Sequence, residues 1–253
     1  TGDISLLRGN QSEIKAIYDA LSPSNQADTA TTGKGVDGGQ VEDSAVVVYR
    51  LARLINCPVV ATGEEDYISD GTRVFAVPHG HSMMSAVTGT GCLLGAVLAA
   101  FFSAFYPCKN RLSIGEFLAY ALAYYGLAGE SAVQVSGVKP GSFSVAFMDG
   151  LYTLDDAVLM SENRIRPIVI PDQLQVYFIS GTQDVELNEN RLLSIVEDAC
   201  RGGVTCFQFR EKGVGTLVGQ QKLELAQQLK QICAKYNVLY IINDDVDLAI
   251  AVN

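Results

Sequence analysis

The chain has 253 residues, of which 48% are hydrophobic, enough for one large globular domain or two smaller ones. Its formal net charge is -10 and it has no basic tract, which argues against nucleic acid or a membrane surface as a partner. The six cysteines are scattered without a C-x-x-C pair, and four lie in apolar runs where a free thiol behaves as a small hydrophobe. This usage predicts reduced thiols in a cytoplasmic protein.

Short β-type runs alternate with longer helical ones from Ile4 onward, the pattern of parallel sheets covered by helices. In chain order we expect a strand ending near Leu7, helices at 12–20 and 44–55, a strand at 58–61, β runs at 67–69 and 73–77, and helices at 92–105 and 113–135. Asp70-Gly71 suits a hairpin turn between the two β runs. The apolar segment 93–106 is shorter than the ~20 residues that a bilayer needs, so we expect a helix buried between a sheet and other helices.

A polar segment after Met160 divides the chain. Pro167 and Pro171 bracket a short extended piece there, which predicts a linker over 161–173 between a first domain at 1–160 and a second at 174–253. The second domain has three βα units, with strands at 176–179, 204–207 and 238–242 and helices at 188–201, 217–236 and 246–252. Three units cannot close a barrel of eight, and the first residue is not Met, so we expect an excerpt of a longer protein.

The sequence Thr88-Gly89-Thr90-Gly91-Cys92 predicts a phosphate-binding turn at the start of a helix. Glycine permits positive φ and close backbone approach, so the N-H groups of residues 89–92 can form an anion hole to which the helix dipole contributes. Such a hole stabilises the charge that develops on a transferring phosphoryl group. The alternative for this motif alone is a glycine turn before a core helix, with an inert buried cysteine.

Three further segments lie at strand ends or in a glycine-rich loop, where ligands bind in open α/β sheets. They are Arg8-Gly9-Asn10-Gln11-Ser12-Glu13, Lys34-Gly35-Val36-Asp37 and Val60-Ala61-Thr62-Gly63-Glu64. With the glycine turn and its cysteine, this set resembles hydroxyethylthiazole kinase over residues 1 to about 150. The resemblance implies a ribokinase-like α/β/α domain, partial here, that uses ATP and Mg²⁺ to phosphorylate 4-methyl-5-(2-hydroxyethyl)thiazole.

The resemblance also implies roles for single residues. Cys92 stands where sugar kinases of this superfamily carry an aspartate base, and Gly89 would touch the thiazole. Arg8 and Thr62 would contact ATP, and Glu13 would help to hold Mg²⁺. Two alternatives stay open: Glu13 is also typical of a first-turn helix carboxylate favoured by the dipole, and Arg8 of a surface charge. Because the family is trimeric, the resemblance further implies a homo-oligomer.

A second set of polar residues lies at two strand ends of the second domain. One strand ends in Gln208-Phe209-Arg210-Glu211-Lys212, where alternation places Gln208, Arg210 and Lys212 on one side, which suits a diphosphate ester. The next strand ends in Asn243-Asp244, where the amide can bind a ligand and the carboxylate can offer oxygen to Mg²⁺ on phosphates. Taken singly, the first pattern also suits a solvated strand end and the second a helix N-cap.

These residues and their surroundings resemble thiamine-phosphate synthase over residues 174–253. The resemblance implies a partial TIM (β/α)8 barrel that joins hydroxymethylpyrimidine diphosphate to thiazole phosphate, giving thiamine phosphate and diphosphate. It implies that Asp244 binds Mg²⁺ and that the pyrimidine diphosphate is bound by Gln208, Phe209, Arg210, Glu211, Lys212 and Asn243. Gly181-Thr182-Gln183-Asp184 departs from the family's usual Thr-Asp after the first strand, which leaves the roles of these residues open.

The two resemblances support each other, because the product of the first enzyme is a substrate of the second. Together they imply a bifunctional thiamine-biosynthesis enzyme whose partners are small molecules. Two other hypotheses stay open. One is a noncatalytic sensor of thiamine precursors, and the other is a generic ribokinase-like kinase joined to an unrelated phosphate-binding barrel.

Overall fold

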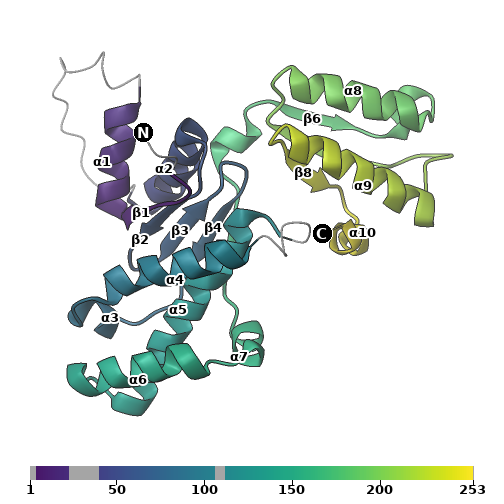
Figure 1. Cartoon of the computed structure of the whole chain (residues 1–253). Helices are drawn as coiled ribbons and strands as arrows, with labels where there is room; N and C mark the ends of the chain where they lie inside the picture. Colours follow the sequence, from purple (N-terminus) through teal and green to yellow (C-terminus); the bar gives the residue numbers. More distant parts are fainter. Residues whose placement is uncertain (1–3, 23–39, 106–111, 253) are drawn as a thin grey trace. The chain divides into compact units, whose positions relative to one another are not determined.

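The structure, a computed structural model, describes residues 4–22, 40–105 and 112–252 (Figure 1). The segment Lys34-Gly35-Val36-Asp37, expected near the first site, lies outside the described residues. The chain divides into two compact units, Thr1–Ile168 and Val169–Asn253. Each unit has its own sheet and its own hydrophobic core, so each is described by itself.

A five-stranded sheet of order β1-β2-β3-β4-β5 forms the centre of the first unit. Its strands are β1 (Leu7–Asn10), β2 (Val59–Thr62), β3 (Asp66–Ser69), β4 (Val74–Val77) and β5 (Arg166–Ile168). β1 and β2 pair in parallel, whereas the other neighbours are antiparallel. The sheet is therefore mixed rather than parallel, because short turns join β2 to β3 and β3 to β4, and only antiparallel strands can be joined in this way.

Helices cover both faces of this sheet. The helices of this unit are α1 (Gln11–Leu21), α2 (Gln40–Ile55), α3 (Met83–Ala86), α4 (Thr90–Ala104), α5 (Ile114–Ser136), α6 (Pro140–Thr153) and α7 (Asp156–Ser161). Figure 1 shows α1 and α2 on one face and α4 and α5 on the other, which makes the unit an α/β/α sandwich. Its main core joins alternate strand residues, among them Ile68 and Val77, to Leu98 and Leu122 of the helices.

Helix α4 is less buried than expected from its sequence, which predicts a helix enclosed between the sheet and other helices. Although its composition is strongly apolar, only Leu94 and Leu98 are buried. These two residues are one helical turn apart and form a single stripe in the core that α4 shares with α5. In the described part of the chain, no helix is long and apolar enough to cross a membrane.

Part of the segment expected to be a linker belongs to the first unit's sheet. β5 pairs with β4, with Ile168 opposite Val74 and Arg166 opposite Ala76. Pro167, which cannot donate a ladder hydrogen bond, is tolerated because β5 is an edge strand. Helices α6 and α7 lie where the sequence pattern predicts no element.

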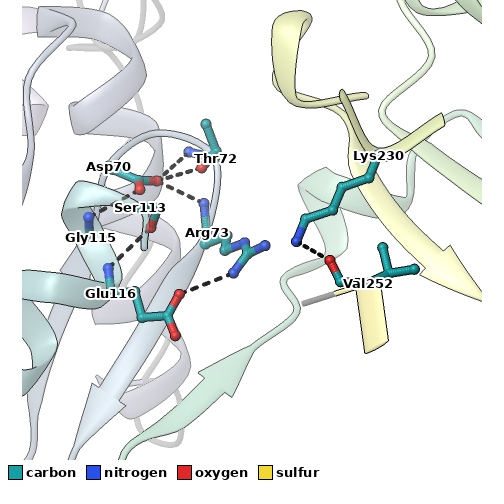
Figure 2. A network of polar contacts seen from close by, with 8 residues as sticks. All are labelled: Asp70, Thr72, Arg73, Ser113, Gly115, Glu116, Lys230 and Val252. Carbon is teal, nitrogen blue, oxygen red and sulfur yellow. Dashed lines mark hydrogen bonds and ion pairs between the residues drawn. The ribbon is translucent and has the colours of Figure 1, made fainter. Parts of the chain in front are cut away.

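Asp70 fixes the turn between β3 and β4 (Figure 2). Its Oδ1 accepts hydrogen bonds from the backbone N-H groups of Thr72 (2.9 Å) and Arg73 (3.0 Å) and from the Thr72 hydroxyl (2.6 Å). Its Oδ2 accepts one from the Gly115 N-H in the first turn of α5 (3.1 Å). Gly71 has φ +84°, so the hairpin predicted from Asp70-Gly71 is confirmed, and one carboxylate joins it to a helix on the sheet.

Asp70→Asn should lower the free energy of unfolding by about 1–3 kcal/mol at pH 7, because an amide cannot accept at both positions. Burial alone would raise the pKa of Asp70, but hydrogen bonds from Thr72, Arg73 and Ser113 outweigh it and hold the pKa below its ordinary value. The stabilisation is therefore present above about pH 4 and lost as the pH falls through the folded-state pKa. Urea unfolding at pH 3 to 7 measures this, and equal pH dependence in Asp70→Asn and the exposed control Asp149→Asn would contradict it.

The second unit contains a parallel sheet of order β6-β7-β8, which confirms the predicted βα repeat. Its elements are β6 (Tyr177–Ser180), β7 (Cys206–Phe209), β8 (Leu239–Ile242), α8 (Glu189–Arg201), α9 (Gly219–Lys235), α10 (Val246–Val252) and the 3-10 helices η3 (Pro171–Leu174) and η4 (Thr182–Val185). Phe207 and Phe209 are buried with residues of α8 and α9. Lys230 on α9 donates a hydrogen bond to the carbonyl of Val252 (2.7 Å), which holds the end of α10 (Figure 2).

Candidate functional site

Arg8 and Thr62 meet at the first unit's two parallel strands. Parallel pairing sets Asn10 opposite Thr62 and brings the carboxyl ends of β1 and β2 together. Arg8 Nη2 donates to Thr62 Oγ1 (3.4 Å), and Thr62 Oγ1 donates to the Gly9 carbonyl (3.2 Å). Arg8 Nε is buried, and within the described residues it has no hydrogen-bond partner. The guanidinium is thus held at the strand ends and keeps a buried donor for an anion.

The predicted glycine turn lies beside Arg8. Helix α4 begins at Thr90, two residues before its predicted start, and its N-cap Gly89 has φ +98°. Since the first intrahelical bond runs from Leu93 N to Gly89 O (2.9 Å), the N-H groups of residues 90–92 are the open donors of the first turn. A Cβ added to Gly91 would lie 3.6 Å from Arg8 Nη2. The cation and the open N-H groups therefore come close together, as an anion site requires.

Hydrogen bonds from two hydroxyl groups, those of Thr90 and Tyr125, hold the glycine turn in place. Thr90 Oγ1 lies 2.5 Å from the carbonyl oxygen of Met84 and 3.1 Å from that of Val87. Tyr125 on α5 donates its hydroxyl to the carbonyl of Thr90. Thr90 therefore offers an anion its N-H and uses its hydroxyl for support. Cys92 is exposed, which contradicts the alternative of an inert, buried cysteine at this position.

Glu13 takes part in a capping box at the start of α1. Its Oε2 accepts a hydrogen bond from Asn10 N (2.7 Å), and Asn10 Oδ1 accepts one from Glu13 N (2.8 Å). The helix-carboxylate alternative for Glu13 is therefore present in the structure. Among the described residues, no three acidic, His or Cys side chains gather as a metal cluster. Glu13 could contribute its carboxylate to a Mg²⁺ ion that phosphate oxygens also bind, a donor set that suits Mg²⁺.

Asp66 is a neighbour of Arg8 that the sequence patterns did not indicate. Its Oδ1 accepts a hydrogen bond from the Gly63 N-H (2.9 Å), which closes the turn after Thr62. Burial raises the pKa of Asp66 to about 7, and the Gly63 hydrogen bond and the charge of Arg8 only partly oppose this. The Gly-x-x-Asp spacing after a strand was the available signal, because Asp often closes such a turn.

The raised pKa of Asp66 predicts a loss of stability with increasing pH. The folded state holds this proton more tightly than the unfolded state, so the free energy of unfolding falls as the pH rises from about 4 to about 7. Asp66→Asn keeps the acceptor for Gly63 and should be more stable than the unsubstituted protein above pH 7, by about 2–4 kcal/mol. Urea unfolding at pH 4 to 8 tests this, with the exposed Glu64→Gln as control. A constant difference between variant and parent would contradict it.

The second set of residues meets at the ends of β7 and β8. Lys212 Nζ forms an ion pair with Asp244 Oδ2. The Lys212 hydrogen bond and charge hold the pKa of Asp244 below its ordinary value. Asp244 has a left-handed φ of 57°, and the neighbouring Asn243 Nδ2 is buried without a hydrogen-bond partner among the described residues. An exposed carboxylate beside a lysine and an unused amide donor fits phosphate oxygens with Mg²⁺.

Two residues predicted for this second site have side chains engaged elsewhere. Phe209 is 1% exposed and belongs to the core between the sheet and its helices. Glu211 accepts hydrogen bonds from the N-H groups of Thr182 (3.0 Å) and Leu217 (3.1 Å) and from the Thr182 hydroxyl. The side chain of Phe209 is therefore directed into the core, and the carboxylate of Glu211 is already occupied.

The chain is an α/β protein of two units, each with polar side chains gathered at strand ends. Residues 1–157 match the model of the hydroxyethylthiazole kinase family, and the chain belongs to this family. Residues 176–253 match the model of thiamine monophosphate synthase. The two matches fall in the two structural units, and they speak against an unrelated phosphate-binding barrel in the second.

Named relatives show the same division. The thiamine biosynthesis bifunctional protein ThiM/ThiE of Symbiobacterium thermophilum is 33% identical over 98% of this chain and 48% of its own length. A hydroxyethylthiazole kinase of Streptococcus agalactiae is 40% identical over 63% of this chain and 57% of its own. The solved hydroxyethylthiazole kinase of Pyrococcus horikoshii aligns with a TM-score of 0.51 at 31% identity, covering 66% of this chain and 56% of that one. The chain thus spans about half the length of these relatives.

Proposed function

We propose that the protein acts in thiamine biosynthesis as a bifunctional enzyme. Its first domain would phosphorylate 4-methyl-5-(2-hydroxyethyl)thiazole with ATP, and its second would join the product to hydroxymethylpyrimidine diphosphate. The observation that carries the proposal is the meeting of Arg8, Thr62 and the glycine turn, three segments distant in sequence. Supplying the thiazole and ATP, and then the pyrimidine diphosphate, tests both steps by product formation. Turnover in neither assay, with tight binding of phosphorylated precursors, would favour the sensor hypothesis instead.

In the kinase step, the chain's own groups would position and stabilise. Arg8 and Thr62 would hold ATP at the strand ends, and Gly89 would contact the thiazole. The N-H groups of the turn would bind the phosphoryl oxygens where charge develops. Mg²⁺, held in part by Glu13, would supply charge neutralisation on the phosphates. As a thiolate, the exposed Cys92 would accept the proton of the substrate hydroxyl. Because a thiolate is a weak base for an alcohol, its contribution should be modest beside that of the anion hole.

Cys92→Ser is expected to lower kcat about tenfold with little change in KM for ATP, below the ~10²–10⁴-fold typical of general bases. Arg8→Met should lower kcat/KM further and raise KM for ATP, because it removes a charge-assisted contact. Steady-state kinetics of thiazole phosphorylation measures both effects. The matched control is Ser103→Ala, an exposed position on the same helix. Full activity in Cys92→Ser would eliminate the base role.

In the second domain, we propose a TIM barrel of which β6, β7 and β8 with their helices are three units. Gln208, Arg210, Lys212 and Asn243 would bind the pyrimidine diphosphate at the strand ends. Mg²⁺ on Asp244 would help the diphosphate to leave the pyrimidine methylene. Lys212 pairs with Asp244 and the charge of Arg210 also acts on it, which supports a common site for these side chains, and the buried Asn243 amide lies next to them. From the family resemblance of the kinase domain, we propose a homo-oligomer.

Lys212→Met should raise KM for the pyrimidine diphosphate about 10- to 100-fold, the value of one charge-assisted hydrogen bond. It should also release Asp244 from its ion pair and raise the pKa of that carboxyl toward its ordinary value. Thiamine phosphate formation at varied substrate concentration measures the first effect. Lys235→Met, which removes an exposed lysine paired with Glu197, serves as control. An unchanged KM in Lys212→Met would remove this lysine from the site.

A further inference from the structure

One carboxylate holds both ends of the loop that carries Lys212. Glu211 Oε1 accepts a hydrogen bond from the Leu217 N-H (3.1 Å), so residues 211 and 217 close the loop between them. Its Oε2 accepts one from the N-H of Thr182 (3.0 Å), and the Thr182 hydroxyl donates to Oε1. Thr182 is fully buried at 0% exposure, so the carboxylate is fastened to a fixed point of the fold.

The tip of this loop contains two glycines in the left-handed region and an exposed valine. Gly213 and Gly215 have φ of +124° and +82°, and Val214 between them is fully exposed. Lys212 is also exposed, and long side chains on glycine-rich loops lose much conformational freedom when they bind. Glu211 removes part of that freedom before a ligand arrives.

The segment after β6 supports the same loop along its backbone. Gln183 Nε2 donates to the carbonyl of Arg210 (2.8 Å), and the Lys212 N-H donates to Gln183 Oε1 (3.4 Å). A Cβ added to Gly181 would lie 2.1 Å from the Arg210 carbonyl oxygen, so only glycine permits this approach. Residues 181–183 thus lie against both cationic residues of the second site.

We propose that Glu211 is a positioning residue of the diphosphate site, acting through Thr182 and Leu217 to fix the directions of Arg210 and Lys212. The proposal rests on the synthase function proposed above. β7 ends at Phe209, and beyond it Lys212 pairs with Asp244, whereas Glu211 lies against Thr182 and Leu217, where its charge is satisfied by the three donors. Glu211 therefore belongs to the site without being a ligand.

The direction in which Glu211→Gln changes the affinity for diphosphate distinguishes a positioning role from a purely electrostatic effect. Neutralising a carboxylate near a diphosphate removes a repulsion, so on charge alone Glu211→Gln would strengthen binding. A glutamine has only one side-chain oxygen, so it cannot replace both Oε1 and Oε2 as acceptors for Thr182 and Leu217. On the proposal, we therefore expect Glu211→Gln to weaken diphosphate binding about tenfold. Thr182→Val, which removes one donor at equal size, should weaken it in the same direction. Thr182→Ser keeps the hydroxyl and should retain the affinity.

Calorimetric titration of the full chain with inorganic diphosphate, with and without Mg²⁺, tests the proposal. Circular dichroism establishes that each variant is folded at the titration temperature, and Glu186→Gln, an exposed carboxylate near the same loop, is the control. Glu211→Gln should cost about tenfold in the parent but clearly less with Lys212→Met, because the part of its effect that passes through Lys212 is then absent and only the part through Arg210 remains.

Each result has a distinct meaning. The proposal is supported if diphosphate binds more weakly to Glu211→Gln and to Thr182→Val while Thr182→Ser keeps the parent affinity. It also requires that the losses caused by Glu211→Gln and Lys212→Met are not additive. Unchanged or tighter binding in Glu211→Gln would overturn it, as would additive losses, which indicate a general structural role. A loss seen only with Mg²⁺ would make Glu211 a metal ligand and overturn it as well. No binding by the unsubstituted chain would overturn the diphosphate site itself, and the role of Glu211 with it.

Discussion

Parallel pairing of β1 with β2 is the constraint on which the first site depends. The register that sets Asn10 opposite Thr62 leaves both strands ending at one edge of the sheet, and Arg8 reaches Thr62 there. The remaining strands are antiparallel, so this is the single parallel junction of the described sheet. The glycine turn reaches the same edge because α4 packs on the sheet through Leu94 and Leu98. A shift of one residue between β1 and β2 would turn Arg8 away from the turn.

The second unit reaches a related solution with a regular βα repeat. Its three strands are all parallel, so every βα loop begins at the same edge of the sheet. Residues of consecutive loops are therefore neighbours at that edge. This explains why one carboxylate, Glu211, can bind the loop after β6 as well as the loop after β7. The two units thus gather cations and N-H groups at carboxyl ends of strands by different topologies.

Much of this arrangement was readable in the sequence, and the failures have physical reasons. The alternation of β runs and helices, the Asp70-Gly71 hairpin and the βα repeat depend on local patterns, and these were predicted. Strand β5 was not, because it pairs with β4, a partner distant in sequence, and such pairing leaves no local signal. Asp66 was missed for a similar reason: its raised pKa comes from burial, which a sequence pattern does not report. The segment Gly181 to Gln183 was noted only as a departure, since its role is to contact another loop.

The ion pair between Lys212 and Asp244 gives the second site its own internal counterion. Arg210 adds a further positive charge that acts on Asp244. If the site binds a diphosphate with its metal, as proposed, the anion could replace the carboxylate as the partner of Lys212, and the cation could replace the ammonium as the partner of Asp244. Such an exchange of partners would favour the metal complex over either of its components alone.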